Sequence, residues 1–224
     1  MRAIPRFVCA AAALLLTLPP APATAQDAPS STSPRIGLRA YGVVDLNTLA
    51  AKDSFDAVLG TSQLTAFGGG ADVVDIWKHL FARVAVTRAR KAGTRVFVAN
   101  GQVFPLSIPL TVTMTPIEVG GGWRFAFSRD SRLTPYAGAA FLSMGYTETS
   151  SFAEAGENTS ERFPGQTVFG GAEFRIVKWL VASGEAQYRR VPNALGAGGV
   201  SRDFGDTDLG GFTARVTFGV RVRQ

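Results

Sequence analysis

Apolar and polar residues alternate one by one along eight segments of this chain, and turn-forming residues separate the segments. A repeat of two residues places successive side chains on opposite faces of a β-strand, so each segment is typical of a strand with one apolar face. The sequence therefore predicts an all-β fold. The segments are residues 35–47, 64–74, 80–90, 111–127, 135–147, 166–175, 180–190 and 211–222. Pro116 interrupts the fourth, where we expect a bulge that turns Val112 and Met114 away from the face of Ile117 and Val119.

The connections between these segments alternate in length. Residues 75–79, 128–134 and 176–179 form short turns, whereas residues 48–63, 91–110, 148–165 and 191–210 form long loops. Short periplasmic turns and long extracellular loops are typical of outer-membrane barrels. We therefore expect an eight-stranded antiparallel up-and-down transmembrane β-barrel, with both chain ends on the periplasmic side.

The N-terminal residues predict export. Arg2 and Arg6 precede an apolar run over residues 7–18, and an Ala-Thr-Ala site ends at Ala25. This is the pattern of a secretory signal peptide, with cleavage between Ala25 and Gln26. We expect a signal peptide at 1–25, a flexible tether at 26–34 and the barrel at 35–224, located in the outer membrane of a Gram-negative-type bacterium.

Alternation alone does not show which face meets lipid, because a soluble lipocalin-like carrier in the periplasm would be apolar inside. The type of charge favours the membrane barrel. Lysines after the signal peptide fall in the connections, whereas the strands carry arginines and acids, which suit a confined ion-pair network. An eight-stranded lumen is wide enough only for its own side chains. The expected lumen network is Arg39, Asp45, Asp72, Arg83, Glu118, Arg124, Glu173, Arg175, Glu185, Arg189 and Arg215.

Aromatic residues near the turns support the same interpretation. Membrane barrels carry girdles of amphipathic rings at the two interfaces. The expected interfacial aromatics are Trp77, Trp123, Tyr136 and Trp179.

Composition excludes several functions. The chain has one Cys and one His, His79, so clustered zinc or haem ligands are excluded and no disulfide framework exists. His79 lies in a short turn, and no nucleophile elbow or phosphate loop occurs, so we expect no catalysis, no metal and no cofactor. Without residues 1–25, 21 Lys and Arg face 17 acids, and this net charge of +4 is too modest for a nucleic-acid partner, although it favours a phosphate-rich lipid surface. Acidic residues in the third and fourth long loops are expected to be solvated rather than to bind a cation.

Several motifs resemble a known family. These are the Ala-Thr-Ala junction, RFAF before a short turn with PYAGAAF after it, and VFGGAEFR before a Trp-containing turn. The chain resembles the bacterial outer-membrane barrels that include the OmpX-like and opacity-protein-like eight-stranded proteins. The resemblance implies a monomer that contacts outer-membrane lipids and lipopolysaccharide, and that uses the barrel-assembly machinery during insertion. Members usually end in an aromatic residue, whereas Phe218 is the last aromatic here.

The functional expectation is a structural or surface-interaction barrel whose loops contact a surface ligand. The alternative is a small-solute channel or transporter, which the narrow lumen disfavours. Apolar residues in the second long loop are the candidate contact surface, either as a projecting hairpin or as a simple continuation of the flanking strands; they are Val96, Phe97, Val98, Val103 and Phe104.

Overall fold

The computed structural model describes residues 36–99, 101–125, 131–152, 158–196 and 199–223. The predicted signal peptide, its cleavage site at Ala25 and Gln26, and the tether lie outside these residues. The strands are β1 Gly37–Leu49, β2 Gln63–Val74, β3 Leu80–Ala99, β4 Gln102–Arg124, β5 Leu133–Thr149, β6 Thr159–Arg175, β7 Leu180–Arg190 and β8 Gly211–Arg223. Two helices lie in the connections, α1 Lys52–Leu59 between β1 and β2, and α2 Gly199–Phe204 between β7 and β8. Among the described residues, no helix has the length and apolarity needed to cross a membrane.

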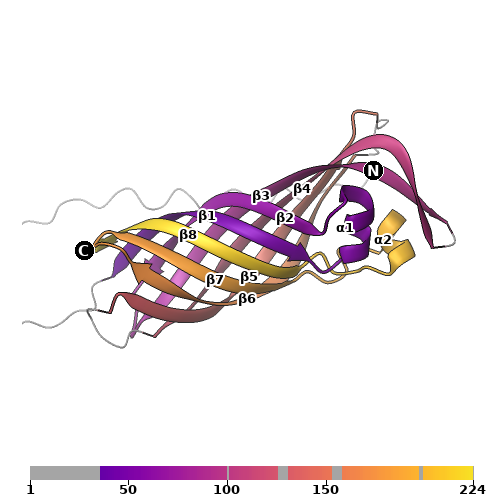
Figure 1. The fold of residues 1–224 in the computed structure, drawn as a ribbon. Helices are drawn as coiled ribbons and strands as arrows, with labels where there is room; N and C mark the ends of the chain where they lie inside the picture. The colour runs from indigo at the N-terminus through magenta and orange to yellow at the C-terminus, as the bar shows by residue number, and fades with distance from the viewer. Residues whose placement is uncertain (1–35, 100, 126–130, 153–157, 197–198, 224) are drawn as a thin grey trace, which may run out of the picture. The chain divides into compact units, whose positions relative to one another are not determined.

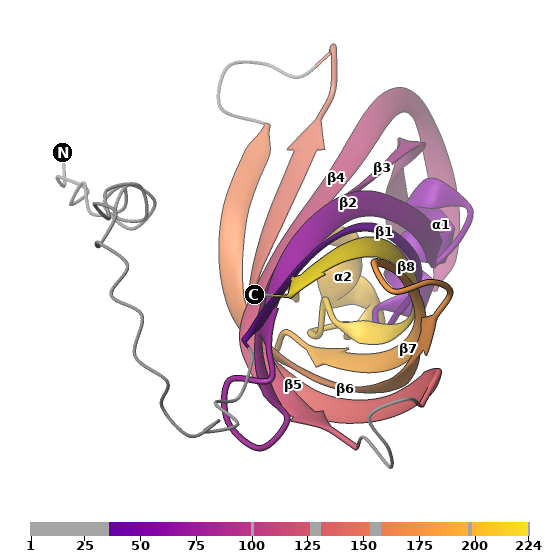
Figure 2. The same cartoon turned by 90° about the vertical axis from the view of Figure 1, so that its left-hand side faces the viewer.

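The strands close into a barrel. Each strand pairs antiparallel with the next, and β1 pairs with β8, as in Asp45 opposite Arg215. Figure 1 shows the strands running between an end with short turns and an end with α1 and α2. Figure 2 shows the barrel from the short-turn end, where the strands enclose the lumen. The predicted eight-stranded up-and-down barrel is confirmed.

The apolar face of the barrel points outward. On β1, Leu38 and Leu46 are 53% and 59% exposed, whereas Arg39 and Asp45 between them are buried. The same alternation continues on β8, where Phe218 is 59% exposed. A soluble carrier barrel has the opposite arrangement, with its apolar face inside. The polar faces predicted from the sequence therefore line the lumen.

The expected bulge at Pro116 is wrong. Val112, Met114 and Glu118 are all buried on one face, and the register between β3 and β4 is the same on both sides of the proline. Pairing is interrupted opposite Pro116 and resumes at Ala89 and Met114. Proline lacks an amide hydrogen, so it can omit a ladder bond without adding a residue to the strand. The register shifts instead between Thr94 and Val96.

Strands β3 and β4 continue beyond the barrel. The pairing of β2 with β3 ends at Ala89, and that of β5 with β4 begins at Thr111. Residues 90–99 and 101–110 therefore project as a two-stranded unit, here called the outer hairpin (Figure 1). Both descriptions of the second long loop are thus correct, because the projecting hairpin is the continuation of the strands.

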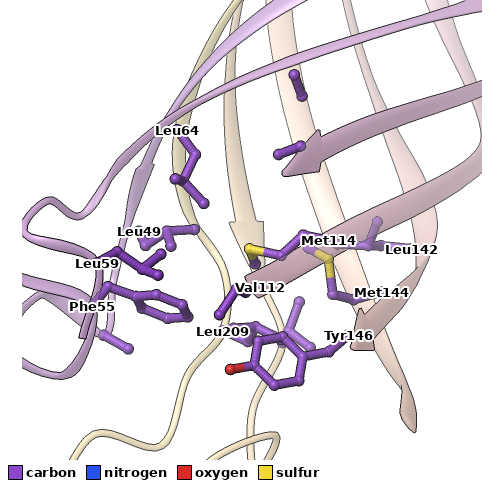
Figure 3. Close-up of a cluster of buried hydrophobic side chains, with 14 of the residues drawn as sticks. Leu49, Phe55, Leu59, Leu64, Val112, Met114, Leu142, Met144, Tyr146 and Leu209 are labelled. Atoms are coloured by element: carbon purple, nitrogen blue, oxygen red, sulfur yellow. The ribbon is translucent and has the colours of Figure 1, made fainter. Parts of the chain in front are cut away.

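A cluster of buried apolar side chains from α1 and the surrounding strands occupies the lumen at the end of the barrel where α1 lies (Figure 3). Helix α1 supplies Phe55 and Leu59 and packs on the backbone of β3 at Gly93. A Cβ atom at Gly93 would lie 2.2 Å from the Val58 carbonyl oxygen, so only glycine permits this approach. The cluster of buried apolar side chains in the lumen is here called the apolar plug. It includes Leu49, Phe55, Leu59, Leu64, Leu110, Val112, Met114, Leu142, Met144, Tyr146, Val191 and Leu209.

Candidate functional site

Oppositely charged side chains form a continuous series through the lumen between the short turns and the apolar plug. Each arginine in it contacts at least two acids. We call this series the charge ladder. Its members are Arg39, Asp45, Asp72, Asp75, Arg83, Glu118, Arg124, Glu173, Glu185, Arg189, Arg215 and Arg221. Six guanidinium groups and six carboxylates therefore balance within it.

Part of the ladder follows strand pairing. Arg215 lies opposite Asp45 on one side and opposite Glu185 on the other. Its Nε donates to Asp45 Oδ1 at 2.7 Å. Its Nη1 instead reaches across the lumen and donates to Glu118 Oε2 on β4 at 2.8 Å, a contact that strand pairing does not provide. Arg39 is opposite Asp72, and Asp72 is opposite Arg83, which donates to it at 3.3 Å. Residues paired in register on one face share a side of the sheet, so these contacts are local.

Other contacts cross the lumen. Arg83 Nη1 on β3 donates to Glu185 Oε2 on β7 at 2.6 Å. Glu173 on β6 accepts from Arg124 on β4 at 2.8 Å and from Arg39 on β1. Strands on opposite walls are thereby joined through charge-assisted hydrogen bonds, which are the stronger kind. These side chains fill the space that a channel would need.

Four aromatic rings surround the Arg83 guanidinium. Its Cζ atom lies 4.7 Å from the ring centroid of Phe169 and 5.4 Å from that of Phe81. The centroids of Tyr136 and Tyr41 are 5.5 and 5.9 Å away. Cation–π attraction is strongest where the cation has little access to water. The rings therefore stabilise Arg83 in addition to its two acids.

Ten of the eleven predicted lumen residues belong to the ladder, and Arg175 does not. It lies two residues beyond Glu173 at the end of β6 and is half-buried. Two ladder members, Asp75 and Arg221, are not among the predicted lumen residues. Asp75, in the turn after β2, accepts from Arg124 at 3.0 Å and from Arg221 at 2.5 Å. Arg221 shares its face of β8 with Arg215, a signal that could have placed it inside.

Three of the four predicted interfacial aromatics lie at the short-turn end. Trp77 and Trp179 are 59% and 58% exposed, and Trp123 is half-buried with its ring 6.3 Å from that of Trp77. The placement of Tyr136 at the interface is wrong. It is 4% exposed inside the barrel, where its hydroxyl is 3.3 Å from Ser183 Oγ. Tyr136 pairs with Arg124 across β4 and β5, so it shares the inward face of that arginine.

The fourth-loop acids act as local hydrogen-bond acceptors. Asp206 accepts from the Ser54 hydroxyl at 2.6 Å. It thus joins α1 to the connection that contains α2, here called the α2 segment (residues 191–196 and 199–210). Asp208 Oδ1 accepts from the amides of Val191 and Gly210, both at 2.8 Å. In the third loop, Glu154 and Glu157 lie outside the described residues. No cluster of three metal-ligating side chains occurs in the part of the chain that the structure describes.

A cavity of about 300 Å³ lies at the end with the helices. Its walls come from α1, the α2 segment, the outer hairpin and β5. The lining is mainly apolar and includes Phe55, Val58, Val96, Leu106, Leu110, Val112, Tyr146, Leu195 and Val200. Its polar members are Ser54, Arg95, Glu148 and Ser201.

Arginines also lie on the outward face near the same end. Arg88 and Arg90 follow the exposed Val86 on β3, and Arg190 follows the exposed Tyr188 on β7. All three arginines are exposed. They therefore border the apolar outer surface on the side of the helices, whereas Trp77 and Trp179 border it on the side of the short turns.

No protein-family model matches the sequence, and no curated protein matches it. Among solved structures, the chain is similar to Ail, the attachment invasion locus protein of Yersinia pestis in complex with the heparin analogue sucrose octasulfate. The identity is 10%, the TM-score is 0.51, and the match covers 85% of this chain and 100% of that one. Neisserial surface protein A has 13% identity and a TM-score of 0.47, covering 84% of this chain and 97% of that one. At this level the similarity to Ail shows the fold alone, that of an eight-stranded outer-membrane β-barrel.

Proposed function

We propose that this protein is an integral, monomeric outer-membrane β-barrel with a closed lumen, and that its role is structural support and recognition at the cell surface. The observation that carries the proposal is where the side chains point. Apolar side chains cover the outside of the barrel and the charge-balanced ladder lies inside, the opposite of a soluble carrier barrel. A continuous apolar outer surface marks a membrane or protein contact. A closed barrel satisfies its backbone hydrogen bonds without water, as a membrane-spanning structure must.

The residues at the two ends of the apolar outer surface support one orientation of the barrel in the membrane. The short-turn end carries exposed tryptophans, which suit a membrane interface. The opposite end carries Arg88, Arg90 and Arg190, and arginine binds phosphate through two parallel hydrogen bonds. We place this end in the outer leaflet, in contact with phosphate groups of lipopolysaccharide. The helices, the cavity and the outer hairpin then face the outside of the cell.

Surface recognition is favoured over solute passage because both parts of the lumen are filled. The charge ladder occupies one part, and the apolar plug occupies the other, at the end of the barrel where α1 lies. Binding residues concentrate on loops that a rigid scaffold positions. The recognition surface is therefore assigned to the end with the outer hairpin.

Membrane fractionation combined with heat-modifiable gel mobility tests the placement. We expect the protein in the detergent-extracted outer-membrane fraction, with a shift in mobility between unheated and heated samples. A protein recovered from the periplasm without detergent would overturn the proposal. An Arg88→Gln, Arg90→Gln variant serves as a test of orientation, since it should reduce association with lipopolysaccharide while leaving heat-modifiability unchanged.

A further inference from the structure

We propose that the cavity at the outer end binds a single-chain amphiphile, with the alkyl chain in the apolar interior and a polar head without net charge at the polar residues. The inference rests on the proposed outward orientation of this end. It adds a ligand class to the surface-recognition role.

The cavity is built by four separate parts of the chain. Helix α1 contributes Phe55 and Val58, and the α2 segment contributes Leu195 and Val200. The hydrogen bond from Ser54 to Asp206 joins these two walls at 2.6 Å. Because α1 also rests on Gly93 of β3, the walls are fixed by packing and hydrogen bonding at several points. Small-molecule sites are usually preformed in this way.

The outer hairpin supplies the remaining wall through its irregular pairing. Thr94 pairs with Pro109, but Val96 pairs with Pro105, so β4 has extra residues at this point. Ser107, among them, has a positive φ of 57°. A bulge bends the strand that contains it. Arg95 and Leu106 lie at this irregularity and both line the cavity.

The lining determines the chemistry of the ligand. A volume of about 300 Å³ with a mainly aliphatic and aromatic lining suits an alkyl chain. The cavity is lined by one guanidinium, Arg95, and one carboxylate, Glu148. A head with a single charge would be attracted by one of these groups and repelled by the other. A neutral, hydroxyl-rich head can hydrogen-bond to both.

The test uses the full-length barrel in lipid nanodiscs, titrated from the aqueous side with hexyl, heptyl, octyl and nonyl glucoside below their micelle-forming concentrations. Methyl NMR of labelled Val and Leu residues reports binding at Val58, Val96 and Leu106. We expect saturable shifts there and about fourfold tighter binding for each added methylene until the chain fills the cavity, after which the gain stops. Partitioning into the bilayer would instead increase without a limit in chain length.

Two variants of the outer hairpin provide the matched comparison. Val96→Trp fills the cavity and should weaken glucoside binding by about tenfold or more. Val103→Trp adds the same ring on the same hairpin, but Val103 does not line the cavity, so binding should stay as in the unchanged protein. Octanoate and octylamine should each bind more weakly than octyl glucoside.

Absence of saturable shifts, equal effects of the two tryptophan variants, or tighter binding of either charged ligand would overturn the proposal. Fractionation of the ligand-free protein is independent of these titrations. A failure of the binding site and a failure of the membrane placement are therefore distinguishable.

Discussion

At the scale of single residues, Arg215 contacts three acids of the charge ladder. It contacts Asp45 through two nitrogens, contacts Glu118, and lies 3.9 Å from Glu185. Its side chain is 1% exposed, so water cannot replace these contacts. A buried ion pair adds little relative to an apolar pair of the same shape, but removing one partner leaves a charge without compensation.

We therefore expect Arg215→Ala to lower the free energy of unfolding by about 3–5 kcal/mol. The measurement is urea unfolding of the folded barrel in lipid vesicles. Arg202→Ala is the matched control because Arg202 is exposed in α2, outside the ladder and the proposed phosphate contacts, and its effect should stay within about 0.5 kcal/mol. Equal unfolding midpoints for the two variants would contradict the burial of Arg215.

Asp75 permits a test of charge alone. Its φ of 60° lies in the left-handed region, which asparagine tolerates as well as aspartate, so Asp75→Asn keeps the backbone of the turn. The variant weakens the contacts with Arg124 and Arg221. We expect a loss of about 1.5–3 kcal/mol in vesicle unfolding experiments, the usual range for hydrogen bonds between charged groups. An unchanged free energy of unfolding would show that the contacts of Asp75 with Arg124 and Arg221 do not stabilise the folded barrel.

The lumen face could be predicted residue by residue, whereas the pairings could not. Alternation puts Arg39, Asp45 and Arg215 on the same side of their strands, and this requires only a period of two. The contact of Arg83 with Glu185 depends on which strands face each other across a closed ring, and the sequence carries no local signal for that. The aromatic ring of Tyr136 predicts a place at the membrane interface. Its position on the inward face of β5, opposite Arg124, decides instead that it lies in the lumen.

At the scale of elements, the packing of α1 on β3 depends on Gly93. In Gly93→Ala the new Cβ would lie 2.2 Å from the Val58 carbonyl oxygen, so α1 must move away from the strand. We expect faster trypsin cleavage after Lys52, at the start of α1, and a loss of about 1–3 kcal/mol from overpacking. The barrel itself should keep its heat-modifiable mobility.

Gly42→Ala is the control for this substitution, because a Cβ atom there would meet no atom within 4 Å. Its trypsin cleavage after Lys52 should match that of the unchanged protein. If Gly93→Ala also matched, α1 would not depend on the close approach seen here.

The strands of the barrel could be predicted because half-buried strands alternate strictly. The two helices and the full length of the outer hairpin could not. Helix α1 has only eight residues, and it is held by the plug rather than by a strong helical pattern of its own. Proline usually disrupts strands, so Pro116 predicts a bulge, but here it only removes a ladder bond.

At the scale of the whole molecule, the filled lumen predicts that the barrel does not conduct ions. We expect purified protein in planar lipid bilayers to show no steady ohmic conductance, because the charge ladder and the apolar plug block the lumen in series. Current recording over many insertions is the measurement. A uniform conductance step at each insertion would contradict the closed lumen and support a small-solute channel.

The seam between β1 and β8 joins the first and last strands of the barrel, and its charges favour one alignment of the two strands over the neighbouring ones. In the observed alignment Asp45 meets Arg215. A slip of one residue would turn Arg215 toward the lipid, and a slip of two would place it opposite Val43 or Asn47. Only the observed closure sets Arg215 directly opposite Asp45. A chain that stops before β8 would lack Arg215 and Arg221 and would leave Asp45 and Glu118 to share Arg189, so the ladder becomes charge-balanced only when the last strand is in place.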